Sequence, residues 1–383
     1  MQTSHPLSGI TVVSIEHAIA APFCTRHLAD LGARVIKVER PGEGDFARAY
    51  DNRARGMASH FVWVNRSKES LALDLKNSEE LEALHHLLES ADVFVQNLAP
   101  GAADRMGLNF DTLSKRNAGL IVCDISGYGS NGPYRGKKAY DLLIQSEAGF
   151  LSVTGTEGGP VKAGCSIADI SAGMYAYSSI LAALIQRGKS GKGCRIDVSM
   201  LECMAEWMGF PLYYALDGAP PPIPSGASHA SIFPYGPFAA GDKRTVMLGI
   251  QNEREWAKFC EQVLEQPELR NDDRFDTNSK RSAARAELTE IILQAFAPLT
   301  AQEVIARLEK ADIANAEVRN MQQVWDHPQL RARGRWMEID TPVGPMPALM
   351  PPGLPDGVAP YIGPVPRVGQ HNEAILGELK APA

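Results

Sequence analysis

Two aspartates stand out among the residues that could do covalent chemistry, because each opens a helix-like stretch. Asp141 ends the segment Lys138-Ala-Tyr-Asp141, and Asp169 ends Ser166-Ile-Ala-Asp169. An ionised carboxylate can attack an activated carbonyl and form a covalent intermediate. The positive end of a helix dipole and its free N–H groups favour an anion, so we expect Asp169 to stay ionised. Either aspartate could equally be an ordinary helix N-cap.

Small side chains surround Asp169 in the predicted helix. These neighbours are Ala168, Ser171, Ala172 and Gly173. We expect them to leave room for a ligand to approach the carboxylate.

A glycine-rich segment follows a predicted strand and matches G-x-G-x-x-G at Gly127–Gly132. The context is wrong for a dinucleotide site, because Pro133 falls where the phosphate-binding helix should continue and no acidic residue follows about 20 positions later. A glycine-rich active-site loop fits better, and a plain turn remains the alternative.

Histidines and cysteines do not form a metal-ligand pattern. The chain has six cysteines without a C-x-x-C pair, and none lies near a histidine at ligand spacing. Cys24 and Cys123 lie in apolar segments, so we expect buried, inert thiols. His17 lies just after the first predicted strand and, considered alone, favours a structural role. No metal site is expected.

The elements that must position these residues alternate between strand and helix in the first 130 residues. Apolar, β-branched runs predict strands at Gly9–Ser14, Arg34–Glu39, Leu71–Leu75, Asp92–Gln96 and Leu120–Asp124. The clearest helix is Asn77–Ala91, with an Asn or Ser cap, early glutamates and a leucine stripe. This alternation predicts an α/β fold with a parallel sheet covered on both faces, which binds ligands beyond the carboxyl ends of its strands.

The chain then changes character. A long helix is predicted at Ile167–Arg187 and a strand at Cys194–Ser199, before a Pro/Gly-rich linker at Asp217–Gly226. We therefore divide the chain into a large domain, residues 1–216 and 330–383, and a small domain with linkers, residues 217–329.

The charge and hydropathy of the chain limit the kinds of partner that the protein is expected to bind. The net charge is −7, and residues 1–140 carry 16 basic and 16 acidic side chains, so neither part is basic enough to track nucleic acid. No apolar run approaches the roughly 20 residues of a membrane span, and the N-terminus lacks a signal-peptide pattern. We expect a cytoplasmic protein that binds neither nucleic acid nor membranes.

Short segments in a fixed order run through nearly the whole chain. They are Leu7–His17, Leu28–Arg40, Asn65–Lys68, Leu73–Lys76, Asn97–Gly101, Asp104–Gly107, Ser126–Gly129, Ala139–Asp141, Ile180–Leu184, Arg187, Gly191–Gly193 and Arg367–Glu373. Their order and spacing resemble the class III CoA-transferases, the family of formyl-CoA transferase and carnitine CoA-transferase. α-Methylacyl-CoA racemase is a relative of this family.

The resemblance implies roles for individual residues. Asp169, in Ala168-Asp169-Ile-Ser-Ala-Gly173, occupies the nucleophile position, and the reaction passes through a mixed anhydride and an aspartyl-CoA thioester. Coenzyme A contacts are implied for His17, Ala18, Arg40, Leu73, Lys76, Asn97, Arg105 and Lys138. The implied fold is a large Rossmann-like domain plus a smaller α+β domain in an interlocked homodimer, with acyl-CoA and small carboxylic acids as substrates.

Departures from the family pattern narrow the reaction. The racemase branch has a histidine where this chain has Tyr140, which is a poor general base near neutral pH, so racemization is the alternative rather than the main hypothesis. The loop around His229 lacks the glycine run of formyl-CoA transferase, and Ile19 replaces a polar residue. We therefore expect a different acceptor, a C5 dicarboxylate such as itaconate, mesaconate or citramalate, with succinyl-CoA as donor.

Two other classes remain open. A catalytically silent CoA-binding protein would bind CoA equally well after Asp169→Ala and show no turnover. A Rossmann oxidoreductase is disfavoured because the chain lacks an acceptable dinucleotide fingerprint.

Overall fold

A computed structural model of the chain describes residues 5–156 and 158–380. The chain forms two compact units, each with its own hydrophobic core. The first unit contains the residues up to Leu151, Lys162–Pro220 and the residues from Leu330 on, and the second contains Ser152–Val161 and Pro221–Gln329.

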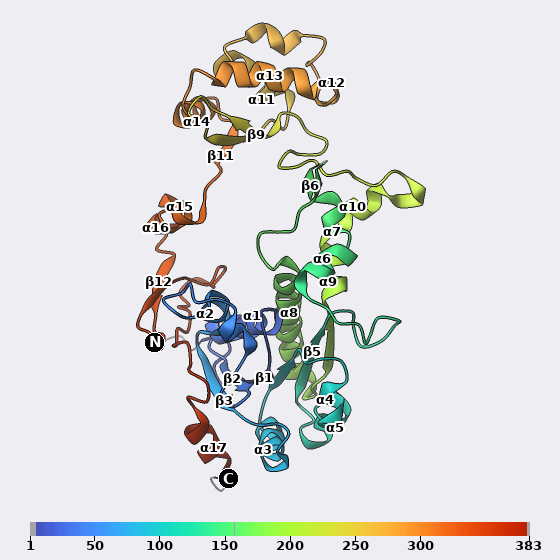
Figure 1. Cartoon of the computed structure of the whole chain (residues 1–383), viewed down its shortest axis with the longest axis vertical. Helices are drawn as coiled ribbons and strands as arrows, with labels where there is room; N and C mark the ends of the chain where they lie inside the picture. The colour runs from blue at the N-terminus through green and yellow to red at the C-terminus, as the bar shows by residue number, and fades with distance from the viewer. Residues whose placement is uncertain (1–4, 157, 381–383) are drawn as a thin grey trace. The chain divides into compact units, whose positions relative to one another are not determined.

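A six-stranded parallel sheet forms the centre of the first unit (Figure 1). In spatial order the strands are β3 (Lys68–Ala72), β2 (Arg34–Glu39), β1 (Thr11–Ile15), β4 (Val93–Gln96), β5 (Ile121–Ser126) and β8 (Arg195–Ser199). The strand order runs outward from β1 in one direction and from β4 in the other, which places a topological switch point between these two strands. The predicted α/β fold with a parallel sheet is confirmed.

Helices cover both faces of this sheet because successive strand residues point to opposite sides. Val12 belongs to the core beneath α1 (Ala20–Asp30) and α8 (Ile167–Ser190), whereas Val13 belongs to the core beneath α3 (Ser78–Glu89). The other helices of the first unit include α2 (Ser59–Asn65), α4 (Ala102–Arg105), α5 (Phe110–Arg116), α6 (Asp141–Glu147), α9 (Met200–Trp207), α10 (Gly209–Tyr214) and α17 (Asn372–Lys380).

Local signals explain α3 well. The side chain of Asn77 accepts hydrogen bonds from the N–H groups of Glu79 at 2.8 Å and Glu80 at 3.3 Å, which satisfies two free donors of the first turn. The third strand, in contrast, was predicted at Leu71–Leu75 and lies at Lys68–Ala72. The prediction was wrong because β3 begins with a buried lysine, Lys68, whose ammonium is paired with Glu16 across 52 residues of sequence.

The long helix α8 packs against α1 and against the sheet. By length and composition α8 could cross a membrane, contrary to the expectation from sequence. Core helices meet the same criterion, and α8 carries seven buried residues on the face that contacts the sheet and α1.

The second unit combines a three-stranded antiparallel sheet with helices around an aromatic core. Its strands are β11 (Ala314–Glu317), β10 (Thr245–Gly249) and β9 (Tyr235–Ala239), and its helices include α11 (Glu253–Lys258), α12 (Asn278–Ala283), α13 (Arg285–Phe296) and α14 (Ala301–Lys310). A separate hairpin in the first unit pairs β12 (Trp336–Ile339) with β13 (Met346–Leu349).

Candidate active site

The chain leaves β1 through a turn at His17 and Ala18, beside the end of β4. His17 N–H donates to Asn97 Oδ1 at 2.9 Å, and Asn97 Nδ2 donates back to His17 O at 2.9 Å. Ala18 has a left-handed backbone with φ of 60°, which is uncommon for a residue with a Cβ. Its N–H donates to Asp45 Oδ1 at 3.2 Å. The turn therefore lies at the switch point of the sheet, where open α/β sheets bind ligands.

A cavity of about 650 Å³ opens beside this turn and extends to Asp169; we call it the Asp169 cavity. Several predicted site residues contribute to its wall: His17, Ala18, Ile19, Arg40, Asn97, Lys138, Tyr140 and Asp169. All of them belong to the first unit, so the fold gathers segments from both ends of a 150-residue stretch around one space.

Asp169 lies half-buried in the first turn of α8, next to the carboxylate of Asp141. Asp141 Oδ1 accepts the N–H of Ala168 at 2.8 Å and the N–H of Asp169 at 3.4 Å, and Gln145 Nε2 donates to Asp141 Oδ2 at 2.7 Å. Burial and the charge of Asp141 raise the pKa of Asp169 to about 7. The expectation that the helix N-terminus keeps Asp169 ionised is therefore wrong, because burial and the charge of Asp141 disfavour the anion, while Asp141 accepts N–H groups of the first helical turn.

The small residues on either side of Asp169 serve packing rather than ligand entry. Ala168, Ser171 and Ala172 are fully buried. A Cβ placed on Gly173 would lie 2.7 Å from Ala20 O and 3.0 Å from the Phe23 ring. The prediction of free space around these residues was wrong: they let α8 approach α1 closely.

A second cavity, of about 510 Å³, shares His17, Arg40 and Leu98 with the wall of the first; we call it the Lys76 cavity. Leu73 and Lys76, both predicted CoA contacts, also line it. Arg40, Lys76 and Lys138 are exposed, and no acidic side chain of the described residues pairs with them. Unpaired cations around two adjacent, partly apolar cavities suit a long ligand with phosphate groups.

Two other predicted residues lie outside these walls. Arg105 ends α4 and lines neither cavity, although the adjacent Met106 lines the Lys76 cavity. His229 belongs to the second unit, where its Nδ1 accepts N–H groups of Ser231 and Ile232 at 3.2 and 3.1 Å. These bonds hold its own loop.

Sequence reasoning missed several residues that line the Asp169 cavity: Phe46, Tyr50, His60 and Met200. Phe46 and Tyr50 lie in the segment between β2 and α2, and His60 lies in the first turn of α2, a stretch in which the sequence predicted no element. Burial raises the pKa of Tyr50 to about 12, with further contributions from the charges of Asp45 and Asp169. By contrast the predicted Tyr140 is 69% exposed, and the predicted Ile19 is only 3% exposed and packs in a small apolar cluster.

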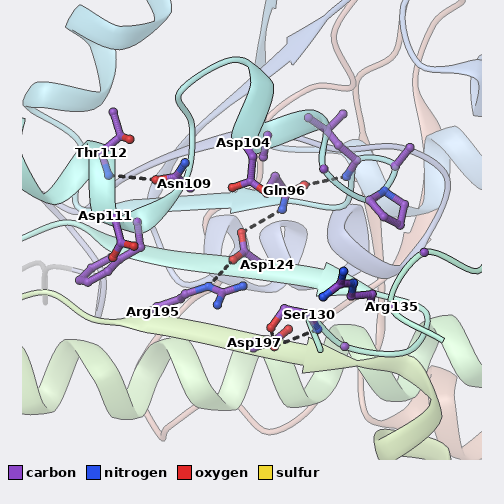
Figure 2. Close-up of a pocket in the computed structure, with 18 residues that line it drawn as sticks. Gln96, Asp104, Asn109, Asp111, Thr112, Asp124, Ser130, Arg135, Arg195 and Asp197 are labelled. Atoms are coloured by element: carbon purple, nitrogen blue, oxygen red, sulfur yellow. Dashed lines mark hydrogen bonds and ion pairs between the residues drawn. The ribbon is translucent and has the colours of Figure 1, made fainter. Parts of the chain in front are cut away.

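The glycine-rich segment borders both the Asp169 cavity and a third cavity, of about 830 Å³, which is lined by residues of β5, β8, α4 and α5. These two cavities also share Leu98, Ala99 and Pro100 in their walls. Gly127 lines the Asp169 cavity, where a Cβ would lie 2.1 Å from Ala139 Cβ, and Gly129 lines the third cavity. In Figure 2, Asp124 bridges Gln96 and Arg195, with bonds of 2.9 and 2.7 Å. None of the predicted site residues lines this third cavity.

Cys24 and Cys123 are buried as predicted, and burial raises the pKa of both thiols well above the usual range. Within residues 5–156 and 158–380, no group of three His, Cys, Asp or Glu side chains is arranged to hold a metal ion.

Comparisons with known proteins cover nearly the whole chain. Residues 7–372 match the family described as CoA-transferase family III. The human succinyl-CoA:glutarate CoA-transferase is 33% identical over 99% of this chain and 87% of its own length. The succinyl-CoA:mesaconate CoA-transferase of Haloarcula hispanica is 32% identical over 88% of this chain and 86% of its own length. Other matched relatives are named as CoA-transferases acting on oxalate.

Comparison with solved structures agrees with the match along the sequence. A crystal structure of a CAIB/BAIF family protein from Brucella suis superposes with a TM-score of 0.88 and 32% sequence identity, covering 99% of this chain and all of the other. The match along the sequence, the shared fold and the switch-point cavities show that the chain belongs to CoA-transferase family III, enzymes that transfer coenzyme A between an acyl-CoA and a carboxylic acid.

Proposed function

We propose that Asp169 is the nucleophile of this transferase. The main observation in support is the position of its half-buried carboxylate in the wall of the Asp169 cavity, which adjoins the cation-bordered Lys76 cavity. Burial and the neighbouring Asp141 raise its pKa to about 7, which makes the ionised carboxylate more basic than an ordinary aspartate. A more basic carboxylate attacks a thioester more readily.

The proposed reaction keeps the energy of the thioester bond through four displacements. A carboxylate oxygen of Asp169 attacks the thioester carbonyl, the C–S bond breaks, and a mixed anhydride and CoA thiolate result. The thiolate attacks the aspartyl carbonyl and releases the donor acid, leaving an aspartyl-CoA thioester. The acceptor carboxylate then attacks this thioester and displaces the thiolate, which attacks the acceptor's acyl carbon and frees Asp169.

Coenzyme A binds, in this proposal, across the two adjacent cavities. The cations of Arg40 and Lys76 receive phosphate groups at the Lys76 cavity, and Leu73 packs against the apolar part of the nucleotide. The pantetheine arm passes the His17–Ala18 turn and carries the thioester to Asp169. In this arrangement coenzyme A contacts the residues that line both cavities, His17, Arg40 and Leu98.

The proposed acceptor is a C5 dicarboxylate and the proposed donor is succinyl-CoA. Two relatives that match most of this chain are named for the C5 dicarboxylates glutarate and mesaconate and for succinyl-CoA. His60 lines the Asp169 cavity, and its ring supplies a hydrogen-bond donor for the second carboxylate of such an acid. Initial rates with succinyl-CoA and a panel of glutarate, mesaconate, itaconate, citramalate and oxalate test this, and a preference for oxalate would refute it.

We also propose that the enzyme is a homodimer. Apolar side chains crowd the exposed surface of α9 and α10, where Phe210 is 70% and Tyr213 is 74% exposed. Surfaces of this kind mark protein contacts. Light scattering should give twice the 41.5 kDa mass of the chain, and Phe210→Glu with Tyr213→Glu should shift it toward one chain; a single-chain mass for the natural protein contradicts this proposal.

The decisive experiment is intact-protein mass spectrometry after incubation with succinyl-CoA and trapping with hydroxylamine or borohydride. We expect modification that maps to Asp169 and disappears in Asp169→Ala, while Asp104→Ala, a carboxylate of the third cavity, keeps it. An unmodified chain that exchanges the α-proton of an acyl-CoA with solvent would instead support a racemase.

A further inference from the structure

Four charged side chains lie beneath the His17–Ala18 turn without any solvent exposure: Glu16, Lys37, Asp45 and Lys68. We call them the buried charge cluster. Lys37 Nζ lies 2.8 Å from Asp45 Oδ2, and Lys68 Nζ lies 2.6 Å from Glu16 Oε1. Buried ion pairs seldom stabilise a fold more than well-packed apolar side chains would, because desolvation offsets their attraction. The cluster therefore calls for another explanation than stability.

The cluster and Asn97 together bind the backbone of three consecutive residues. Lys37 Nζ donates to Glu16 O at 3.2 Å, and Asp45 Oδ1 accepts Ala18 N–H at 3.2 Å. Between them, Asn97 binds both the N–H and the C=O of His17. Side chains from β2 and from the segments after β2 and β4 thus hold the turn in a conformation that its own sequence does not favour, since Ala18 has φ of 60°.

Asp45 also holds a second wall of the Asp169 cavity. Its Oδ1 accepts the N–H of Ala47 at 2.9 Å, which caps the 3₁₀ helix Phe46–Ala49. Phe46 lines the cavity and stacks on His17 with ring centroids 5.2 Å apart. One carboxylate therefore fixes both the turn and the aromatic side chain that stacks on it.

The donors around Asp45 require a carboxylate. Ala18 N–H, Ala47 N–H and the Lys37 ammonium all donate to its two oxygens. The two backbone N–H groups share Oδ1, which an asparagine can keep, but its NH₂ group would then face the Lys37 ammonium in place of Oδ2. A buried ammonium without its carboxylate is costly, so Lys37, which also holds Glu16 O, must shift and loosen the turn.

We propose that Asp45 is a positioning residue for the transfer reaction, which holds the His17–Ala18 turn and Phe46 where the acyl-CoA thioester meets Asp169. This inference rests on the proposed function of Asp169 and assigns to Asp45 no contact with the reacting atoms. The other members of the buried charge cluster neutralise the charge of Asp45. Its carboxylate can therefore stay ionised in a dry interior and accept hydrogen bonds in a fixed position.

The test compares Asp45→Asn with Asp30→Asn, both measured well below their unfolding temperatures. Asp30 is also a buried aspartate paired with cations, Arg26 and Arg66, but it lies outside the buried charge cluster and lines none of the three cavities. We expect Asp45→Asn to lower kcat/KM for succinyl-CoA about 10- to 100-fold, the range of misplaced active-site geometry. It should also speed amide exchange of residues 16–19. Asp30→Asn should stay within about twofold of the natural enzyme in kcat/KM.

Equal rates and equal amide exchange in the two variants would overturn the proposal. If Asp45→Asn does not fold, two charge-balanced double variants replace it, Lys37→Met with Asp45→Asn and Lys37→Met with Asp45→Leu. The first keeps an acceptor for Ala18 N–H and should be at least about tenfold faster than the second; equal activity refutes the role. Amide exchange measures the stability of the turn and does not depend on catalysis. A missing adduct on Asp169 in the natural enzyme would therefore refute the proposed nucleophile without deciding the role of Asp45.

Discussion

Asp141 and Asp169 share one helix N-terminus: Asp141 Oδ1 accepts the N–H of Asp169 at 3.4 Å and that of Ala168 at 2.8 Å. Asp141 therefore receives the hydrogen bonds, and Asp169 is left half-buried beside its charge. Burial is the first cause of the raised pKa of Asp169, and the repulsion from Asp141 is the second. This pair supplies a carboxylate whose ionisation falls near neutral pH.

The pH dependence of the first chemical step follows from that pKa. Because only the ionised form attacks, kcat/KM for succinyl-CoA should rise through a midpoint near pH 7 and then level off. Asp141→Asn removes the repulsive charge but keeps an acceptor for the helix N–H groups, so the midpoint should move to lower pH. Profiles of kcat/KM between pH 5.5 and 9 measure this shift of the midpoint, which should be on the order of tenths of a pH unit. Asp104→Asn is the control, and its midpoint should not shift. An unmoved midpoint in Asp141→Asn contradicts the coupling.

Asp169→Asn should abolish transfer and stabilise the fold at alkaline pH. Folding raises the pKa of this carboxyl group from 3.8 to about 7, so its ionisation costs stability that accumulates between those two values and is complete above pH 7. The full linkage of about 4 kcal/mol is reduced by solvent screening, because the Asp169 side chain is only half-buried, which leaves about 1–3 kcal/mol at pH 8. Urea unfolding at pH 5 and pH 8 measures it.

The gain from Asp169→Asn should be smaller at pH 5 than at pH 8. The exposed Asp356 provides a control, since Asp356→Asn should leave the unfolding free energy unchanged at both pH values. A gain that is equal at the two pH values would show that repacking, not ionisation, causes it.

Close packing of α8 on α1 predicts opposite effects for two glycines of the same helix. Gly173→Ala places a Cβ 2.7 Å from Ala20 O and should cost about 1–3 kcal/mol. Gly188→Ala meets nothing within 4 Å. It should stabilise the helix by about 0.5–1 kcal/mol, because alanine loses less backbone entropy than glycine. Chemical unfolding of both variants measures the difference, and equal effects would refute the packing role of Gly173.

The unpaired cation of Lys76 should contribute to acyl-CoA affinity and little to chemistry. Lys76→Ala should raise KM about five- to tenfold with kcat within about twofold, as expected for an exposed charge that binds a phosphate equally in ground and transition states. The same change should weaken the dependence of KM on ionic strength. Lys115, an exposed lysine of α5, is the control. A fall in kcat with unchanged KM would place Lys76 in the chemical step instead.

The sequence alone determined the scaffold and much of the site. Runs of β-branched residues predicted most sheet strands to within a few residues, because β1, β2 and β4 are nearly continuous buried segments, and the Asn77 cap predicted the start of α3. Residues at the carboxyl ends of those strands, such as His17 and Asn97, follow from the rule that open sheets bind ligands there. The family resemblance then singled out Asp169.

Only the tertiary structure decided which local signals meet. Asp141 reaches the helix N-terminus of Asp169 from 28 residues away, and Glu16 is paired with Lys68 from 52 residues away, so neither the raised pKa nor the buried lysine has a local pattern. The residues around Asp169 are small because α1 packs against them, which no spacing along one helix reveals. Strand periodicity is a property of neighbours in sequence, whereas charge, burial and close packing depend on neighbours in space, and folding alone brings those together.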